Sequence, residues 1–258
     1  MRNAARFLLF VFVTGAAQAA MVAKPIDYSL GDTHFQGQLV YDDATTAKRP
    51  GLVMIPNWYG INAAAIAKAK MIAGKDYVIF LGDMYGKDTR PDSRDSASAA
   101  VKPLYGDRSI MRARVNAALD QLKAQAGSAP IDLKHLGALG FCFGGSAALD
   151  LARSGADIQT VVTFHGGLAT DDPALAKNIK AHVLVLNGAD DKGVGPDVPA
   201  FQDEMRAANI DWQLVNFGGA VHCFTEVGEN STGCKYDEKV SNRAYVMMRD
   251  WLAESWRG

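Results

Sequence analysis

The sequence predicts a single α/β domain, built on a mainly parallel sheet with helices on both of its faces. Three observations support this prediction: short apolar runs alternate with helical patterns, several runs are apolar at successive positions, and no long linker divides the 258 residues. Strands that alternate with helices are typical of β-α-β units, and a strand covered on both sides has two apolar faces. α/β folds of this length routinely form one unit.

The expected strands are the runs rich in apolar and β-branched residues. They lie at residues 36–41, 51–55, 77–81, 135–141, 159–165, 182–187 and 212–217. We expect their carboxyl ends to share one edge of the sheet.

Two long helices are predicted by apolar residues spaced three and four apart. One stripe comprises Met111, Val115, Leu119, Leu122 and Ala126, and the other comprises Val240, Ala244, Met247, Met248, Trp251 and Leu252. Both stripes are interpreted as core faces. Residues 87–107 are rich in Asp, Arg, Ser and Pro. We expect them to form a surface excursion at the carboxyl edge of the sheet, either a lid or a plain solvated loop.

The composition is that of a globular protein with nearly balanced charge. Apolar residues make up 48% of the chain, and 27 Lys and Arg face 28 Asp and Glu. A balance of this kind indicates neither disorder nor a strongly charged partner, so nucleic acid is not an expected ligand.

The first nineteen residues have the pattern of a secretory signal peptide. Arg2 and Arg6 precede an apolar run at residues 7–13, and Ala17 and Ala19 offer the small residues that a signal peptidase reads. We expect cleavage after Ala19, a domain over residues 20–258, and a periplasmic or secreted product without stable membrane association. The alternative is an uncleaved anchor, although the run is far shorter than the ~20 residues that span a bilayer.

The segment around Cys142 predicts the reacting group. An apolar strand runs directly into Gly140-Phe141-Cys142-Phe143-Gly144, and a helix of small residues follows. This is the nucleophile elbow of α/β-hydrolase folds with cysteine in the serine position. Glycines two before and two after the nucleophile remove side chains that the sharp turn excludes. The partial positive charge of the helix start favours the thiolate, which is the attacking form.

An acid and a histidine are expected in loops after later strands, in that order. Asp190 and Asp191 follow the strand at residues 182–187, and either could orient the base. Of five histidines, only His222 lies in the loop after the last strand. His165 ends a strand and either lines the rim of the site or is structural. No pair of histidines has metal-ligand spacing, so no metal is expected.

The remaining cysteines favour a disulfide. An exported protein permits disulfides, and Cys223 and Cys234 flank a polar stretch, residues 229–233, that can turn the chain back. The competing pair, Cys142 with Cys223, would block the nucleophile.

From about Tyr28 to Leu252 the chain resembles the dienelactone hydrolase family. The matching segments are residues 57–62 (Asn-Trp-Tyr-Gly-Ile-Asn), residues 82–86 (Gly-Asp-Met-Tyr-Gly), the elbow, residues 188–191 (Gly-Ala-Asp-Asp) and the His222 loop. The resemblance implies that Asp191 is the acid and that the backbone N–H groups of Trp58 and Phe143 form an oxyanion hole. It also implies a substrate pocket lined by Asn57, Tyr59 and Glu226.

Two positions depart from the family pattern. Asn57 stands where family members that hydrolyse dienelactone carry a glutamate thought to help generate the thiolate. Glu226 stands where they carry an arginine that binds the substrate carboxylate. We therefore expect a carboxylate near Glu226 to be repelled, unless Arg108, Arg112 or Arg114 reaches the pocket.

The resulting expectation is a small-molecule ester or lactone hydrolase, of the carboxymethylenebutenolidase type, that needs no cofactor. Cys142 attacks the carbonyl, a thioester forms, and water cleaves it. The alternative is a non-hydrolytic protein of the same fold in which Cys142 is a redox-sensing or ligand-binding thiol.

Overall fold

The computed structural model describes residues 21–257, and the expected signal peptide and its cleavage site lie outside them. An eight-stranded sheet has the order β1-β2-β4-β3-β5-β6-β7-β8. Its strands are β1 (Met21–Leu30), β2 (Thr33–Asp42), β3 (Arg49–Ile55), β4 (Val78–Leu81), β5 (Ile131–Phe141), β6 (Thr160–Phe164), β7 (His182–Gly188) and β8 (Trp212–Phe217). The strands β9 (Asn230–Ser231) and β10 (Cys234–Lys235) form a separate hairpin.

The sheet is parallel from β4 to β8, and only β1 and β2 run antiparallel to their neighbours. The α-helices are α1 (Ala63–Ala73), α2 (Arg94–Gly106), α3 (Arg108–Ala124), α4 (Phe143–Arg153), α5 (Val198–Ala207) and α6 (Glu238–Ser255). Short 3₁₀ turns occupy Gln125–Gly127, Pro173–Asn178 and Gly195–Asp197.

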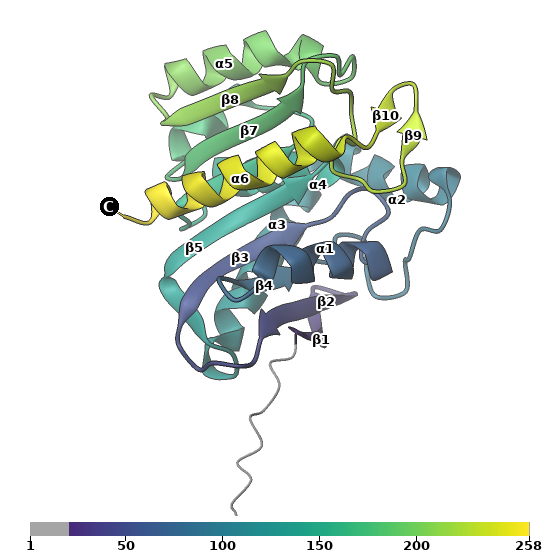
Figure 1. Ribbon diagram of the computed structural model, residues 1–258. Coiled ribbons are helices and arrows are strands. Elements are labelled where there is room, and N and C mark those ends of the chain that lie inside the picture. Colours follow the sequence, from purple (N-terminus) through teal and green to yellow (C-terminus); the bar gives the residue numbers. More distant parts are fainter. Residues whose placement is uncertain (1–20, 258) are drawn as a thin grey trace, which may run out of the picture.

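Helices cover the sheet on both faces, so two cores form (Figure 1). One core joins the sheet to α1 and α6, and the other joins it to α3, α4 and α5. The central strands β3, β4, β6 and β7 are almost wholly buried, which explains their continuous apolar runs. The predicted α/β-hydrolase architecture, a single domain with a mainly parallel sheet, is confirmed.

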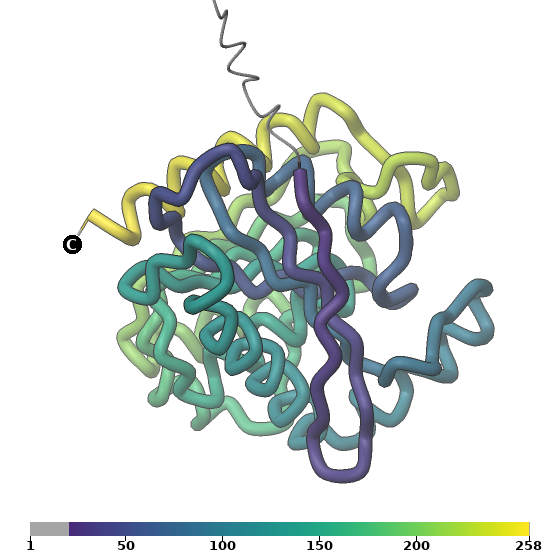
Figure 2. Tube along the Cα trace, turned by 90° about the horizontal axis from the view of Figure 1, so that it is seen from below, coloured from purple at the N-terminus to yellow at the C-terminus, as the bar shows by residue number. Residues whose placement is uncertain are grey.

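All seven predicted strands are present, and β1 is a strand that the apolar pattern does not reveal. It pairs antiparallel with β2 along its whole length, and most of its side chains are exposed or half-buried. Figure 2, a view from below, shows the two strands as a long hairpin that lies in front of the rest of the chain. An edge strand lacks a second neighbour, so it tolerates polar residues and Pro25.

The prediction of a plain loop at residues 87–107 is wrong, because α2 occupies most of this segment. The Ser93 hydroxyl caps the helix by accepting from the N–H of Ser96, and the Ser96 hydroxyl in turn accepts from the N–H of Ser93. Val101 and Leu104 are buried on the helix face that meets the body. The many polar residues therefore belong to a capped, half-exposed helix at the same end as the β9–β10 hairpin (Figure 1).

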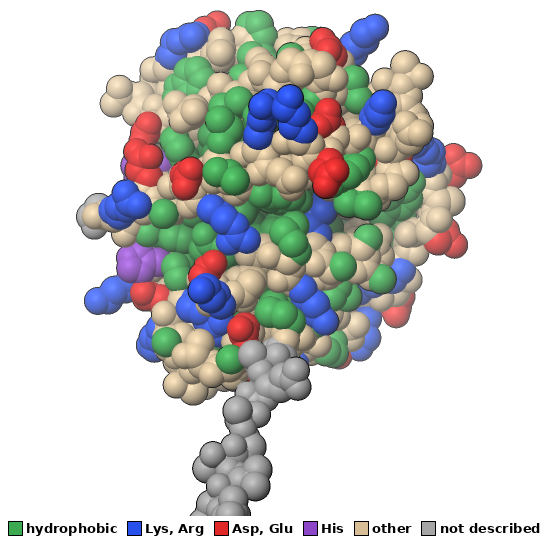
Figure 3. Space-filling view, in the orientation of Figure 1, with side chains coloured by type: hydrophobic (Ala, Val, Ile, Leu, Met, Phe, Trp, Pro, Cys, Tyr) green, Lys and Arg blue, Asp and Glu red, His purple; other side chains and the backbone are tan. Residues whose placement is uncertain are grey.

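The two predicted helical stripes lie in α3 and α6, except that Ala126 falls in the 3₁₀ turn Gln125–Gly127. Met111, Val115, Leu119 and Leu122 are fully buried, whereas Met247 of the second stripe is exposed. On the face that carries α1 and α6, positive and negative side chains are interspersed with apolar ones (Figure 3). No helix in the described part of the chain has the length and apolar character needed to cross a bilayer.

Candidate active site

Cys142 lies on a sharp turn between β5 and α4. Its backbone has φ 55° and ψ −119°, a left-handed conformation that a residue with a side chain adopts only under constraint. The constraint comes from both sides, because the Cys142 N–H donates to the carbonyl of Phe164 and its carbonyl accepts from Gly145. The sulfur thus stands at the amino end of a buried eleven-residue helix.

The glycines of the elbow are required by backbone contacts. A Cβ atom at Gly140 would lie 2.0 Å from the carbonyl oxygen of Gly144. A Cβ atom at Gly144 would lie 2.1 Å from the carbonyl oxygen of Ile55. Neither position can hold a side chain unless strand and helix separate. The helix start is consequently pressed against the end of β3, next to the loop that carries Trp58.

His222 and Asp191 meet at the same sheet edge. Asp191 follows β7 and His222 follows β8, and because these strands are parallel their carboxyl ends lie together. Asp191 Oδ2 is 2.6 Å from His222 Nδ1, and Asp191 Oδ1 accepts from the N–H groups of Gly193 and Val194. Asp190 is exposed, so the structure pairs the histidine with Asp191.

The protonation of His222 is controlled by its two partners. Burial opposes its charged form, but hydrogen bonds to Asp191 and to the Cys142 thiol outweigh burial and raise the pKa of His222 to about 10. Burial alone would raise the pKa of Asp191, yet the bonds from His222, Gly193 and Val194 hold it below its usual value. At neutral pH the pair is therefore imidazolium and carboxylate.

The histidine loop is fastened to the β9–β10 hairpin. Cys223 and Cys234 form the disulfide expected from the sequence, with 4.9 Å between their Cα atoms, and Cys142 is free. The carbonyl of His222 also accepts from the N–H of Lys235 at 2.9 Å. Two attachments to one hairpin therefore hold the backbone at His222.

Two backbone N–H groups near Cys142 are expected to form the oxyanion hole, those of Trp58 and Phe143. Phe143 is the first residue of α4, and the first N–H groups of a helix have no partner within it. The residues 57–60 form a turn in which Asn57 accepts from Tyr59 and from Gly60. Within residues 21–257 the Trp58 N–H has no hydrogen-bond partner, so both predicted oxyanion donors are available.

A cavity of about 260 Å³ opens in front of the sulfur. It is lined by Asn57, Trp58, Tyr59, Arg94, Cys142, His222, Cys223, Glu226, Glu229 and Cys234. The structure thus places all three predicted pocket residues around the predicted triad. Arg94 enters from α2, so the segment expected to be a lid or a loop contributes one wall.

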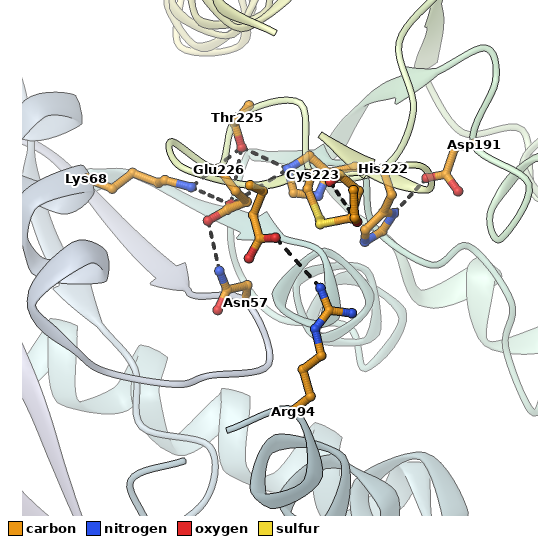
Figure 4. Close-up of a disulfide and its surroundings, with 12 residues drawn as sticks. Asn57, Lys68, Arg94, Asp191, His222, Cys223, Thr225 and Glu226 are labelled. Carbon is orange, nitrogen blue, oxygen red and sulfur yellow. Dashed lines mark hydrogen bonds and ion pairs between the residues drawn. A yellow bond between two sulfur atoms is a disulfide. The ribbon is translucent and has the colours of Figure 1, made fainter. Parts of the chain in front are cut away.

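Glu226 does not present the free carboxylate that its sequence position suggests. Its Oε1 atom lies 2.5 Å from Lys68 Nζ, and its Oε2 atom accepts from Asn57 Nδ2 at 2.8 Å (Figure 4). Lys68 lies on α1 among the buried residues Ala65, Ala69 and Ile72. A lysine within an apolar stripe usually has a buried partner, and this signal in the sequence could have revealed the role of Lys68.

The three arginines considered as substrate ligands lie elsewhere. Arg108 pairs with the buried Asp150, Arg112 pairs with Asp150 and Asp171, and Arg114 donates to the carbonyl of Met84. None of them lines the cavity before Cys142. Arg94, which the sequence did not single out, is the arginine that does.

His165 lies behind the site. Its ring is fully buried, 5.0 Å from the ring of His222, and its Nε2 atom bonds Thr225 Oγ1 at 2.8 Å. Burial, with His222 and Lys68 nearby, lowers the pKa of His165 well below its usual value. It is a neutral, structural neighbour of His222. Among the described residues no group of His, Cys, Asp and Glu has the arrangement of a metal site.

Several known proteins are similar to this chain in sequence and in architecture. Residues 35–256 match the model of the dienelactone hydrolase family. The protein m3DLH is 37% identical with a TM-score of 0.86, over 92% of this chain and 99% of that one. The promiscuous phosphotriesterase P91 from metagenomic libraries, described as dienelactone hydrolase-like, is 36% identical with a TM-score of 0.85, over 91% and 98%.

One relative has a lactonase name. A protein of Bradyrhizobium, described as a probable 2-oxo-3-(5-oxofuran-2-ylidene)propanoate lactonase, is 28% identical over 208 residues, which are 75% of this chain and 82% of the relative.

Proposed function

Because this chain belongs to the dienelactone hydrolase family and is a hydrolase of lactones or esters, we propose that Cys142, His222 and Asp191 form its catalytic triad. The observation that carries the proposal is the placement of His222 between the two others. It bonds Asp191 through Nδ1 at 2.6 Å, and it lines the same cavity as Cys142, which stands at a helix start and raises the pKa of His222.

The first half-reaction forms a thioester. The thiolate of Cys142 attacks the carbonyl carbon, and a bond forms between sulfur and carbon while the carbonyl electrons move to the oxygen. Collapse of this intermediate breaks the bond to the leaving oxygen, which takes the proton from the His222 imidazolium. Asp191 holds the ring in place and stabilises its charged form.

The second half-reaction releases the acid. Neutral His222 takes a proton from water, and the resulting hydroxide attacks the thioester carbonyl. The bond between carbon and sulfur breaks, which restores the thiolate and the imidazolium. The N–H groups of Phe143 and Trp58 receive the oxyanion in both halves, and one such donor contributes about 3 kcal/mol to lowering the barrier.

The proposal is tested with purified mature protein and a panel of aryl esters, lactones and dienelactones. We expect repeated turnover by the wild type, none by Cys142→Ala and a trace by Cys142→Ser, with unchanged circular dichroism. A wild type that reacts with one equivalent of electrophile and then stops would support the alternative of a sensing or ligand-binding thiol. Undiminished turnover by Cys142→Ala would exclude Cys142 as the nucleophile.

We further propose that the chain is exported and cleaved after Ala19. Arg2 and Arg6, the apolar run and Ala17 support this, and so does the disulfide, which persists in oxidising compartments. Amino-terminal sequencing of protein recovered from the periplasm or medium tests the proposal, and a product that begins at Met1 would contradict it.

A further inference from the structure

A hydrogen-bonded relay crosses from α1 to the turn at residues 57–60. Lys68 Nζ contacts Glu226 Oε1 at 2.5 Å, and Glu226 Oε2 accepts from Asn57 Nδ2 at 2.8 Å. Figure 4 shows Lys68 and Asn57 pointing toward Glu226 from two directions. The Lys68 and Glu226 side chains are only 14% and 13% exposed, so their interaction is largely shielded from water. Both carboxylate oxygens are occupied by the protein itself.

The Asn57 side chain is used at both ends. Its Nδ2 atom donates to Glu226, while its Oδ1 atom accepts from the N–H of Tyr59 at 3.0 Å. Only one orientation of the amide satisfies both contacts, because a carboxylate cannot donate and an N–H cannot accept. Glu226 therefore selects the orientation in which Asn57 closes the turn.

The turn presents the Trp58 N–H. The Asn57 carbonyl accepts from Gly60 at 2.9 Å, and a turn closed in this way leaves the N–H of its second residue unused. From the other side, the Tyr85 hydroxyl donates to the Trp58 carbonyl at 2.9 Å. The direction of the Trp58 N–H is consequently set by Asn57 and Tyr85.

Lys68 is the counter-ion that this arrangement needs. Burial lowers the pKa of Lys68, and the adjacent Glu226 carboxylate opposes that effect. The ammonium also lies 4.2 Å from the centre of the ring of Phe141, the residue that precedes Cys142. A buried carboxylate without a partner is costly, and Lys68 supplies the opposite charge that Glu226 needs beside Asn57.

We propose that Glu226, neutralised by Lys68, is a positioning residue that orients the Trp58 oxyanion donor through Asn57. This inference rests on the proposed hydrolytic function. It assigns to Glu226 a role in transition-state stabilisation without contact to substrate. It also explains why an amide stands at position 57, since a carboxylate there would face the carboxylate of Glu226.

The relay is tested by exchanging its donor and acceptor. Besides Lys68 and Asn57, the Thr225 hydroxyl donates to Glu226 Oε1 at 3.3 Å. In Glu226→Gln one amide oxygen replaces two carboxylate oxygens, so either Lys68 or Asn57 loses its contact. In Asn57→Asp two carboxylates face each other. In the double variant Asn57→Asp/Glu226→Gln every contact is again matched: the glutamine oxygen meets Lys68 and its amide donates to the new carboxylate.

We expect each single variant to lose about tenfold to a hundredfold in kcat with little change in KM, because a displaced oxyanion donor acts on the transition state. The double variant should recover to within about threefold of the wild type. Alkylation of Cys142 by iodoacetamide should be unaffected in all three variants, since displacement at carbon needs no oxyanion hole. A role in thiolate formation would slow it.

Asp27→Asn is the matched control. Asp27 also accepts from a lysine, Lys87, and from an amide, Gln36, but at 62% exposure on the β1–β2 edge. It should leave hydrolysis unchanged. Thermal unfolding checks each fold, and if Asn57→Asp does not fold, the double variant must still hydrolyse faster than Glu226→Gln.

The inference is overturned by single variants as active as the wild type, by a double variant no faster than Glu226→Gln, or by alkylation that slows in parallel with hydrolysis. Its failure is distinct from failure of the proposed function. If only the inference fails, the wild type still turns over esters and Cys142→Ala does not. If the proposed function fails, the wild type itself has no turnover.

Discussion

His222 and Cys234 are paired in a backbone bridge, and the disulfide from Cys234 reaches the residue that follows His222. The proposed base is therefore held by covalent and hydrogen-bonded links to the same hairpin. This arrangement couples a structural feature, the disulfide, to the geometry of the reaction.

Reduction of the disulfide should lower both stability and activity. Closing a loop with a sequence separation of 11 residues stabilises the fold by about 3 kcal/mol, chiefly by restricting the unfolded chain. We expect Cys234→Ser to unfold at a lower temperature and to lose kcat, because the His222 loop is less constrained. Non-reducing peptide mapping should recover linked peptides with Cys223 and Cys234 and a Cys142 that reacts with iodoacetamide. Free Cys223 and Cys234 thiols in exported protein would contradict the prediction.

The triad residues should differ in the severity of their replacement. His222→Ala removes the base and should reduce turnover nearly to background. Asp191→Asn should be milder by roughly two orders of magnitude, since it impairs orientation but leaves nucleophile and base. Asp190→Asn should resemble the wild type because this side chain is exposed. Steady-state kinetics of the three variants tests this prediction. If Asp190→Asn lowers turnover more than Asp191→Asn does, Asp190 and not Asp191 is the acid of the triad.

The pH profile should extend far into the alkaline range. Since the pKa of His222 is raised to about 10, the imidazolium persists there, and kcat/KM should fall only as the pH passes that value. Asp191→Asn removes one of the groups that raise this pKa, so the alkaline limb should move to lower pH. A wild-type profile that already declines near pH 6.5 would show that the pKa of His222 is not raised.

The same shift has a consequence for stability. A raised histidine pKa contributes stability that is fully present below the ordinary value of 6.5 and is lost as the pH rises toward about 10. Denaturation by urea should therefore need less denaturant at pH 10 than at pH 6, and His222→Ala should flatten this difference.

Neutral substrates should be preferred over carboxylated analogues. Glu226 and Glu229 both line the cavity against one arginine, Arg94, which lies 3.8 Å from Glu229. Because Lys68 offsets Glu226, we expect a modest preference, about 1 kcal/mol or roughly fivefold in kcat/KM. Matched pairs of esters test this prediction. A preference for the carboxylated member that disappears in Arg94→Gln would mean that Arg94 binds the substrate anion.

The sheet and the elbow could be predicted because their signals are local. The apolar runs at residues 51–55 and 135–141 need burial on both faces, and the glycines around Cys142 are demanded by a turn that the sequence itself contains. The edge strand β1 and the helix α2 gave weaker signals, since each exposes one side to solvent. The polar residues around the cap formed by Ser93 and Ser96 have the same composition as an ordinary polar loop, so the sequence does not distinguish the two.

The partners of the pocket residues could not be predicted for a different reason. The contact between Lys68 and Glu226 joins residues 158 positions apart, and neither residue has a motif around it. Sequence position alone made Glu226 an unpaired charge, and only the tertiary structure supplies its partners. The positions of Arg108, Arg112 and Arg114 were open for the same reason, because a long side chain can pair with any acid within reach.

The close contact between Gly144 and the carbonyl of Ile55 means that the position of the reacting groups and the shape of the cavity depend on different parts of the structure. The spacing between the Cys142 sulfur and the proposed oxyanion donors is set by backbone packing, whereas Tyr59, Arg94 and Glu229 line the cavity around them. The reaction centre can thus remain intact while the surrounding side chains diversify. The enzyme should be a tolerant starting point for directed evolution toward new acyl groups, provided that libraries leave both elbow glycines untouched.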